Sequence, residues 1–188
     1  MHSVPNLPAS ESVIITQTEN WIKSVVIGCN FCPFAAKAVQ LKSIRYAVLH
    51  ETNTKEILTT LITECIYLNN NDNTETTIII LPNSFHGFDD YLDLIDKAER
   101  LLLKAAYEGI YQLASFHPLY CFEVAPKDDA ANYTNRSPYP MLQILREDSI
   151  TKALKKFPDP DSIPEKNIDY ARKKGLHFME KLRASCLE

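Results

Sequence analysis

Three short apolar runs alternate with two amphipathic stripes, and this alternation constrains the fold more than any other feature of the chain. The runs cover residues 44–49, 77–81 and 110–116, and the stripes fill the two intervals between them. Short apolar runs are typical of buried strands, whereas apolar residues three and four positions apart are typical of one helical face. The order strand, helix, strand, helix, strand predicts parallel strands joined by right-handed crossovers.

The boundaries of these elements carry their own signals. The run at residues 77–81 does not alternate with polar residues, which predicts a central strand covered on both faces. Asn53 followed by Glu56 resembles a capping pair at the start of the first stripe. The second stripe, from Phe88 to Ala105, has the clearest helical periodicity in the chain.

The segments outside this unit are predicted to be mostly helical. An amphipathic helix over residues 11–27 ends at Gly28, and a shorter helix starts near Cys32 and Pro33. Residues 141–145 are a fourth strand or, alternatively, a helix capped by Ser137. A short helix then runs to Leu154, and a basic helix over residues 168–182 ends the chain.

We therefore predict an α/β fold with a small, mainly parallel β-α-β-α-β sheet flanked by helices. The alternative is an α+β ferredoxin-like two-layer sandwich. Residues 11–188 are expected to form one domain after a flexible tail of residues 1–10, since 188 residues can bury one core.

Charge and composition exclude several classes of function. The net charge of -4 is spread without a basic block, so we expect no nucleic-acid partner. No apolar run approaches the roughly 20 residues of a membrane span, and no signal peptide is evident. Five cysteines, an odd number, indicate reduced thiols, and we expect a cytoplasmic protein. The common dinucleotide and phosphate-loop glycine patterns are absent, which weighs against a Rossmann dinucleotide enzyme and a P-loop NTPase; the sequence does not identify a cofactor.

The segment from His117 to Pro138 has no periodicity, and a loop of this length in a compact domain is usually functional. Arg136 offers a planar fork for a carboxylate or phosphate, while His117 and an aspartate could exchange protons. The alternative is a hydrogen-bonded Ω-type loop in which Arg136 pairs with one of the aspartates. The polar residues gathered in this loop are Asp128, Asp129, Asn132, Asn135, Arg136 and Ser137.

The pair Cys29-x-x-Cys32 allows two sharper interpretations. A helix start after Cys32 would stabilise a reactive thiolate, whereas a cysteine between two phenylalanines is more often a buried hydrophobe. With His117 and Cys121 the pair could instead form a four-ligand zinc site. Three histidines that follow the three strands, namely His50, His86 and His117, are a further metal candidate, but we predict no metal.

Four segments of the chain resemble the domain of unknown function 1415 family of bacterial and plant proteins. They read WIKSVVIGCNFCPF, QLASFHPLYCF and DDAANYTNRSPYPMLQILRE, together with residues 85–92, and they span nearly the whole chain. The family has no established activity. Residues that match its pattern are Cys32, Pro33, Phe34, Phe116, His117, Pro118, Tyr120, Asp128, Asp129, Asn132, Asn135, Arg136, Ser137, Pro138, Arg146 and Glu147.

The chain departs from this family pattern at Cys29, Cys121 and Gln143, where the family has leucine, glutamine and histidine. The departures weigh against the zinc site and a Cys29–Cys32 redox couple. The resemblance therefore favours His117 and the loop at residues 128–137 as the site.

Our leading hypothesis is an enzyme or ligand-binding protein for a small anionic molecule. Arg136 and Ser137 would anchor the anion, and Asn132 and Asn135 would orient it. His117, together with Asp128 or Asp129, would donate and accept protons. The first alternative is a thiol redox or acyl-transfer activity at Cys32, which we expect near His117 at one edge of the sheet. The second is a non-catalytic interaction protein, for which the loop forms no pocket.

Overall fold

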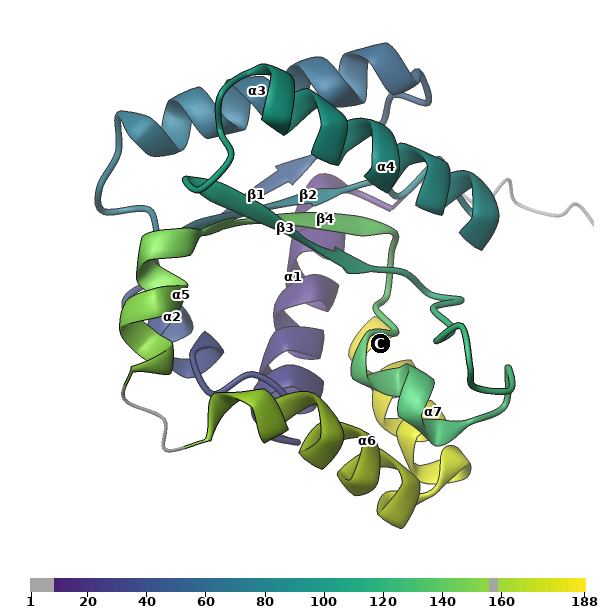
Figure 1. Ribbon diagram of the computed structural model, residues 1–188. Helices are drawn as coiled ribbons and strands as arrows, with labels where there is room; N and C mark the ends of the chain where they lie inside the picture. The colour runs from purple at the N-terminus through teal and green to yellow at the C-terminus, as the bar shows by residue number, and fades with distance from the viewer. Residues whose placement is uncertain (1–8, 156–158) are drawn as a thin grey trace, which may run out of the picture.

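The computed structural model describes residues 9–155 and 159–188, and its centre is one four-stranded sheet (Figure 1). The strand order across the sheet is β1-β2-β4-β3, with helices packed on both faces. This arrangement confirms the α/β class. The strands are β1 (Ile44–Val48), β2 (Thr76–Ile80), β3 (Tyr111–Phe116) and β4 (Met141–Arg146).

The sheet is mixed, so the prediction of a mainly parallel sheet is wrong. β1 and β2 are parallel, but β4 lies between β2 and β3 and runs antiparallel to both. The predicted fourth strand is therefore confirmed, and its insertion separates β3 from the two strands with which it shares a direction. Apolar residues on β4 signal a buried strand, but they carry no information about its direction or neighbours.

Helices α3 (Thr54–Asn69) and α4 (Phe88–Lys104) cover one face of the sheet (Figure 1). The Asn53 side chain accepts a hydrogen bond from the amide of Lys55, so it caps α3 as the sequence predicts. The core beneath the two helices is mainly apolar, and it includes the buried carboxylate of Glu64, which pairs with Arg45 and accepts from Thr77. Its buried hydrophobic residues are Leu49, Ile57, Leu61, Cys65, Leu68, Ile79, Leu81, Leu94, Ala98, Leu102, Tyr111, Leu142 and Ile144.

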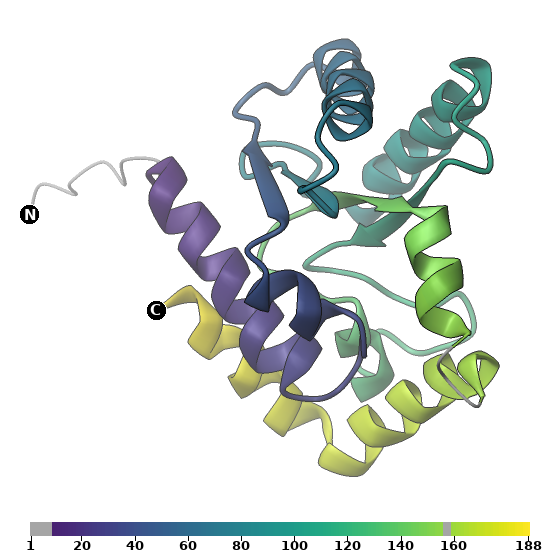
Figure 2. The same ribbon diagram turned by 90° about the vertical axis from the view of Figure 1, so that its left-hand side faces the viewer.

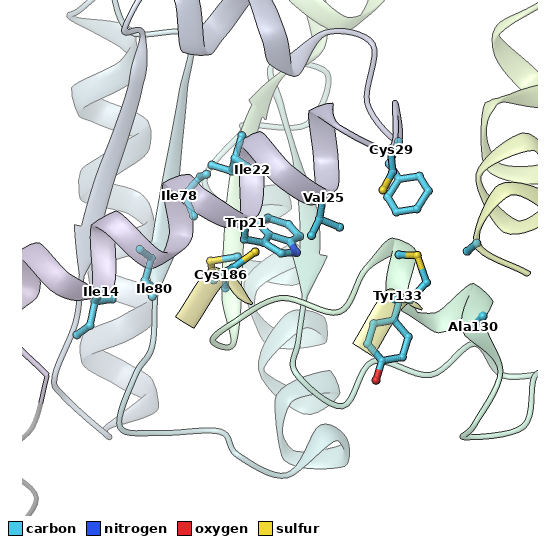
Figure 3. Close-up of a cluster of buried hydrophobic side chains, with 14 residues drawn as sticks. Ile14, Trp21, Ile22, Val25, Cys29, Ile78, Ile80, Ala130, Tyr133 and Cys186 are labelled. Atoms are coloured by element: carbon cyan, nitrogen blue, oxygen red, sulfur yellow. The ribbon is translucent and has the colours of Figure 1, made fainter. Parts of the chain in front are cut away.

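The opposite face is covered by segments that are far apart in the sequence. They are α1 (Glu11–Trp21), which continues as a π-helix (Ile22–Ile27), and the C-terminal helices α6 (Ile163–Lys174) and α7 (Leu176–Ala184). Figure 3 shows how Trp21, Ile78, Cys186 and Tyr133, from four different segments, meet in this second core. The face therefore forms only when both ends of the chain have folded onto the sheet.

Two helix predictions need correction. The second helix, α2 (Ala35–Gln40), starts three residues after Cys32, and the last helix is two helices because Gly175 adopts a φ of 85°. That left-handed backbone ends α6 and favours glycine. Gly28 is required for a different reason, since a Cβ there would lie 2.3 Å from the carbonyl oxygen of Ser24.

The remaining elements are short. They are α5 (Glu147–Leu154), which follows β4 directly, and three 3-10 turns, η2 (Ala130–Thr134), η3 (Pro160–Ser162) and η4 (Ser185–Leu187). Within the described residues no helix has the length and apolar character needed to cross a membrane. Most of the predicted flexible tail, residues 1–8, lies outside the described residues.

Candidate functional site

The polar loop, residues 117–140, connects the end of β3 to the start of β4. It lies at the edge of the sheet where β1, β2 and β3 end, and it packs against α6 and α7 (Figure 1). Asp129 begins the turn η2, because its Oδ1 accepts a hydrogen bond from the amide of Ala131. The loop is therefore placed where ligands bind in open α/β sheets.

His117 is fully buried and its two ring nitrogens are both hydrogen-bonded. Nδ1 accepts from the amide of Leu119 at 3.0 Å, and Nε2 lies 2.8 Å from the carbonyl oxygen of Phe85. A carbonyl can only accept, so Nε2 carries the proton and the ring is neutral. A proton-transfer role would require one of these bonds to open, and that role stays a prediction.

The surroundings of His117 favour this neutral form. Burial lowers the pKa of the imidazole, and the nearby charges of His86 and Arg183 lower it further, against the hydrogen bond to Phe85. The rings of Phe88 and Tyr91 lie 5.3 and 4.9 Å from the imidazole, centroid to centroid. Phe85 itself has a left-handed φ of 55°, so the His117 bond holds a strained backbone.

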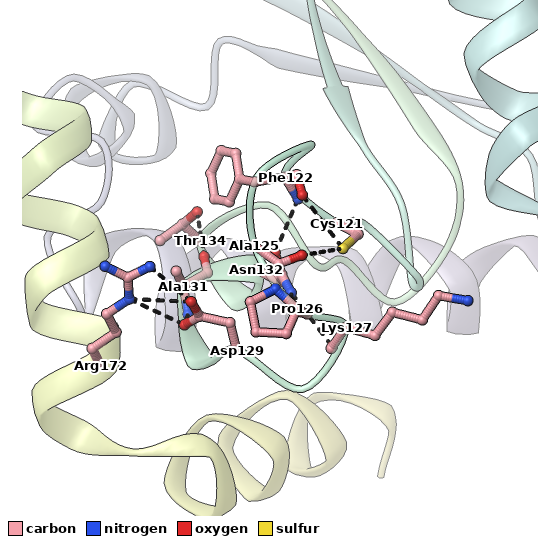
Figure 4. Close-up of polar contacts among 10 residues, drawn as sticks. All are labelled: Cys121, Phe122, Ala125, Pro126, Lys127, Asp129, Ala131, Asn132, Thr134 and Arg172. Atoms are coloured by element: carbon pink, nitrogen blue, oxygen red, sulfur yellow. Dashed lines mark hydrogen bonds and ion pairs between the residues drawn. The ribbon is translucent and has the colours of Figure 1, made fainter.

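Asn132 has no exposed surface and holds the polar loop together (Figure 4). Its Oδ1 accepts from the amide of Phe122, and its Nδ2 donates to the carbonyls of Pro126 and Lys127. All of these partners belong to the loop itself. In this structure the amide thus shapes the loop, and its predicted contact with a ligand stays untested.

The two aspartates differ in their environment. Asp129 accepts three charge-assisted hydrogen bonds from Arg172 on α6, the shortest at 2.7 Å, and Arg172 lowers the pKa of its carboxyl group (Figure 4). Asp128 is exposed. The expected pairing of an aspartate with Arg136 is replaced by Asp129–Arg172, which joins the loop to the C-terminal helices.

Asn135 and Ser137 also bond within the loop. The Asn135 side chain accepts from the hydroxyl of Thr134, and the Ser137 hydroxyl donates to the carbonyl of Tyr139. Asp128, by contrast, is exposed to solvent.

Arg136 binds backbone carbonyls. Its Nε donates to Tyr120 at 2.9 Å and one terminal nitrogen donates to Lys127 at 2.7 Å, while its guanidinium carbon lies 4.7 Å from the centre of the Tyr133 ring. The carbonyl of Arg136 accepts from the Trp21 indole. The side chain is therefore fixed in place with its positive charge unpaired by any carboxylate of the described chain.

Arg183 on α7 contacts the polar loop, and the sequence analysis missed it. Its Nε donates to the carbonyl of Ser137 at 2.9 Å, and burial lowers its pKa, with the charge of Arg136 lowering it further. No carboxylate of the described chain forms an ion pair with it. Its spacing from the buried Met179 and Cys186 places it on the inner face of α7, and that spacing was a usable signal.

The cysteine pair lies away from this group. Cys29 is buried, and burial raises the pKa of its thiol, whereas Cys32 is partly exposed. Between them, Phe31 accepts a hydrogen bond from Asn167 on α6 through its carbonyl. No contact in the described residues joins Cys32 to His117, and the following helix α2 lies at the other end of the sheet from the polar loop (Figure 1). The activity predicted for Cys32 stays a prediction.

No group of three or more His, Cys, Asp or Glu residues in the described parts of the chain is placed to hold a metal ion. The zinc set of Cys29, Cys32, Cys121 and His117 is not assembled, because both His117 nitrogens are bonded to backbone and Cys121 bonds to loop carbonyls. The three-histidine candidate is not assembled either. The expectation that no metal binds remains a prediction for solution experiments.

The fold and the polar loop define a class of mixed-sheet α/β protein in which a loop rich in polar residues joins the last two strands and is locked onto C-terminal helices. Residues 13–181 match the family described as "Protein of unknown function (DUF1415)", and the chain belongs to this family. Searches of the curated proteins and of the solved structures gave no match.

Proposed function

We propose that the protein binds a small anionic molecule through Arg136 and Arg183. One observation carries the proposal: backbone carbonyls of the polar loop hold both guanidinium groups in a partly buried region, and neither group forms an ion pair with a carboxylate of the described chain. Two like charges that are partly removed from water repel each other, and a bound anion would remove that repulsion.

The hydrogen-bonding capacity of the two side chains supports this proposal. A guanidinium has five N–H donors, and the carbonyls of the loop use Nε and one terminal nitrogen of Arg136 but only Nε of Arg183. The remaining terminal donors are suited to the oxygen atoms of a phosphate or a carboxylate, which guanidinium groups bind in pairs. The carbonyl contacts hold both forks in place before a ligand arrives.

In this proposal, other predicted site residues hold the surrounding backbone in place. Asn132 and Asn135 fix the loop that carries Arg136, and His117 fixes the turn before α4. Asp128, which is exposed, is the carboxylate best placed to exchange a proton with solvent or a ligand. A catalytic step would depend on Asp128, or on His117 after it gives up its bond to Leu119.

Thermal melting with a panel of anions tests the proposal. Inorganic phosphate, pyrophosphate and citrate are added to the wild type and to Arg136→Lys and Arg183→Lys, with Arg100→Lys as the control. Arg100 is a suitable control because it lies on α4 in an exposed pair with Asp96. At about 100 times the dissociation constant, a ligand stabilises the folded state by about 2.7 kcal/mol, which raises Tm by roughly 5–10 °C.

We expect at least one of these anions to stabilise the wild type and Arg100→Lys, and to have a much smaller effect on the two site variants. Lysine keeps the charge but loses the planar fork, so affinity falls while folding survives. If no anion in the panel stabilises the wild type, or if the site variants respond like the control, the proposal is wrong and the loop is a structural element.

A further inference from the structure

A hollow of about 350 Å³ lies beside β1. This strand is an outer strand of the sheet, with α1 and α3 on either side of it (Figure 2). Residues of β1 form part of the lining of the hollow, and Ile15 of α1 and Tyr67 of α3 line it from the two helices that flank the strand. The hollow therefore exposes the free edge of a strand at the bottom of a groove between two helices. It lies on different elements from Arg136 and Arg183.

The hydrogen-bond register shows which backbone groups of β1 face this groove. The amide of Leu49 bonds to the carbonyl of Ile80, and the carbonyl of Ser43 accepts from Thr76, so odd-numbered residues bond to β2. Ile44, Tyr46 and Val48 therefore turn their N–H and C=O groups outward. No residue in the described parts of the chain bonds to these six groups.

We propose that this groove binds an extended, acidic segment of a partner protein, which adds to β1 as a fifth strand. Main-chain hydrogen bonds to an exposed sheet edge are a general mode of peptide recognition, with side-chain pockets providing specificity. Here the outward groups of Ile44, Tyr46 and Val48 supply the main-chain bonds. Ile15, Tyr46 and Tyr67 supply an apolar and aromatic lining.

The charge of the groove selects an acidic segment. Lys42 and Arg45 line it and no carboxylate does, although the whole chain carries a net charge of -4. Glu64 forms an ion pair with Arg45 at 2.7 Å and offsets its charge, so the acidic preference of the groove depends on Lys42. Lys42 forms no ion pair with a carboxylate of the described chain.

A second carboxylate near the strand, on α1, is also paired. Glu19 of α1 acts on the Tyr46 hydroxyl and forms an ion pair with Lys23.

A peptide is also a better occupant than a second copy of the chain. The edge lies between two helices, and the β1 of a second copy would be recessed in the same way.

Fluorescence anisotropy with two labelled peptides tests the proposal. The probes are Glu-Val-Thr-Val-Glu and its charge-reversed counterpart Lys-Val-Thr-Val-Lys, both capped at their ends. Tyr46→Pro removes an outward N–H that does not bond to β2, and proline is tolerated at such an edge position. Tyr46→Ala is the matched control, because it removes the same side chain but keeps the N–H.

We expect the glutamate peptide to bind the wild type more tightly than the lysine peptide. Relative to Tyr46→Ala, Tyr46→Pro should lose roughly tenfold in affinity, the effect of about one hydrogen bond. Lys42→Glu should invert the preference between the two peptides. Circular dichroism confirms that each variant is folded.

Three outcomes would overturn the proposal. In the first, neither peptide binds the wild type, and in the second, Tyr46→Pro and Tyr46→Ala bind the glutamate peptide equally. The third is a wild-type dimer in sedimentation that Tyr46→Pro dissociates, which would assign the edge to a second copy of the chain.

Discussion

The two faces of the sheet are held by different interactions. Under α3 and α4 the core is mainly apolar, and the strands and helices that build it, apart from β4, follow one another along residues 44–116. Under α1, α6 and α7 the apolar core is joined to a set of polar contacts whose acceptors are mostly backbone carbonyls. Examples are Trp21 to Arg136, Arg183 to Ser137 and Asn167 to Phe31.

This difference supports placing the proposed anion site on the second face. An apolar layer between adjacent segments stabilises the fold and offers few groups to a ligand. The other face uses charged side chains to hold a loop, and it leaves two guanidinium groups without a carboxylate partner in the described chain. Residues whose burial or polar contacts lower the stability of the fold are common at functional sites.

The largest expected effect is the loss of stability when a buried side chain is removed from the core of either face. Trp21→Ala removes a buried indole and its hydrogen bond to Arg136, and Leu94→Ala removes a buried side chain under α4. Urea denaturation should show losses of about 3–5 kcal/mol for Trp21→Ala and about 2–5 kcal/mol for Leu94→Ala. Leu103→Ala, at an exposed position, should change stability by about 0.5 kcal/mol or less.

Hydrogen exchange then distinguishes the two buried variants. The amides of Leu119 and Phe122 bond to His117 and Asn132 inside the polar loop. They should exchange faster in Trp21→Ala than its loss of global stability explains, and in Leu94→Ala they should follow global stability. If the exchange rates of these amides change in the same way in both variants, the polar contacts do not distinguish the two faces.

The next effect concerns Asn132. Asn132→Ala leaves the amide of Phe122 and the carbonyl of Pro126 without their partner in the loop. Each orphaned buried group costs about 1–3 kcal/mol, so we expect a loss of roughly 2–4 kcal/mol in urea denaturation. Asn73→Ala is the control at an exposed asparagine. If the two substitutions cost the same, the amide of Asn132 does not organise the loop.

His117 should give a pH dependence of stability. Its pKa is lowered in the folded state, so the unfolded chain binds more protons around and below pH 6.5. The stabilising contribution is complete above the unfolded pKa and is lost as the pH falls towards the folded one, by up to about 1.4 kcal/mol per pH unit.

Unfolding free energies between pH 8 and pH 5 test this prediction. His117→Gln should reduce the loss at acid pH, while His177→Gln, at an exposed position, should retain it. An unchanged slope in His117→Gln would assign the pH dependence to other groups.

The smallest effect is expected for Asp129. Arg172 and the amide of Ala131 lower its pKa, so its contribution is present above the unfolded value near 3.8 and is lost as the pH falls below that value. Asp129→Asn should therefore be slightly less stable than the wild type at pH 7 and similar to it at pH 2.5. Asp128→Asn is the matched control, and it should match the wild type at both pH values.

The sequence predicted the α3/α4 face well because its signals are local. The spacing of Ile57, Leu61 and Cys65, the cap at Asn53 and the unbroken apolar run of β2 each depend on neighbouring residues. The direction of β4 could not be predicted in this way. An antiparallel strand between β2 and β3 has the same apolar pattern as a parallel strand at the edge.

The contacts of the polar loop were also predictable only in part, because many of them are not local. The polar loop and Arg136 were identified from composition, but the contacts that fix the roles of these residues join distant segments. Arg172 reaches Asp129 across 43 residues, and Trp21 reaches Arg136 across 115. Most of the acceptors are backbone carbonyls, which no side-chain pattern marks, so the sequence analysis did not single out Arg183.

The most direct test of the central claim follows the arginine side chains themselves by NMR. The Nε–Hε signals of ¹⁵N-labelled protein are recorded while inorganic phosphate, pyrophosphate and citrate are each titrated in. The account predicts that one of these anions shifts the signals of Arg136 and Arg183 together, with a common saturation curve, while those of Arg100 and Arg172 stay in place. Equal, non-saturating shifts of all four signals, or no shift of Arg136 and Arg183 with any of the anions, would contradict it.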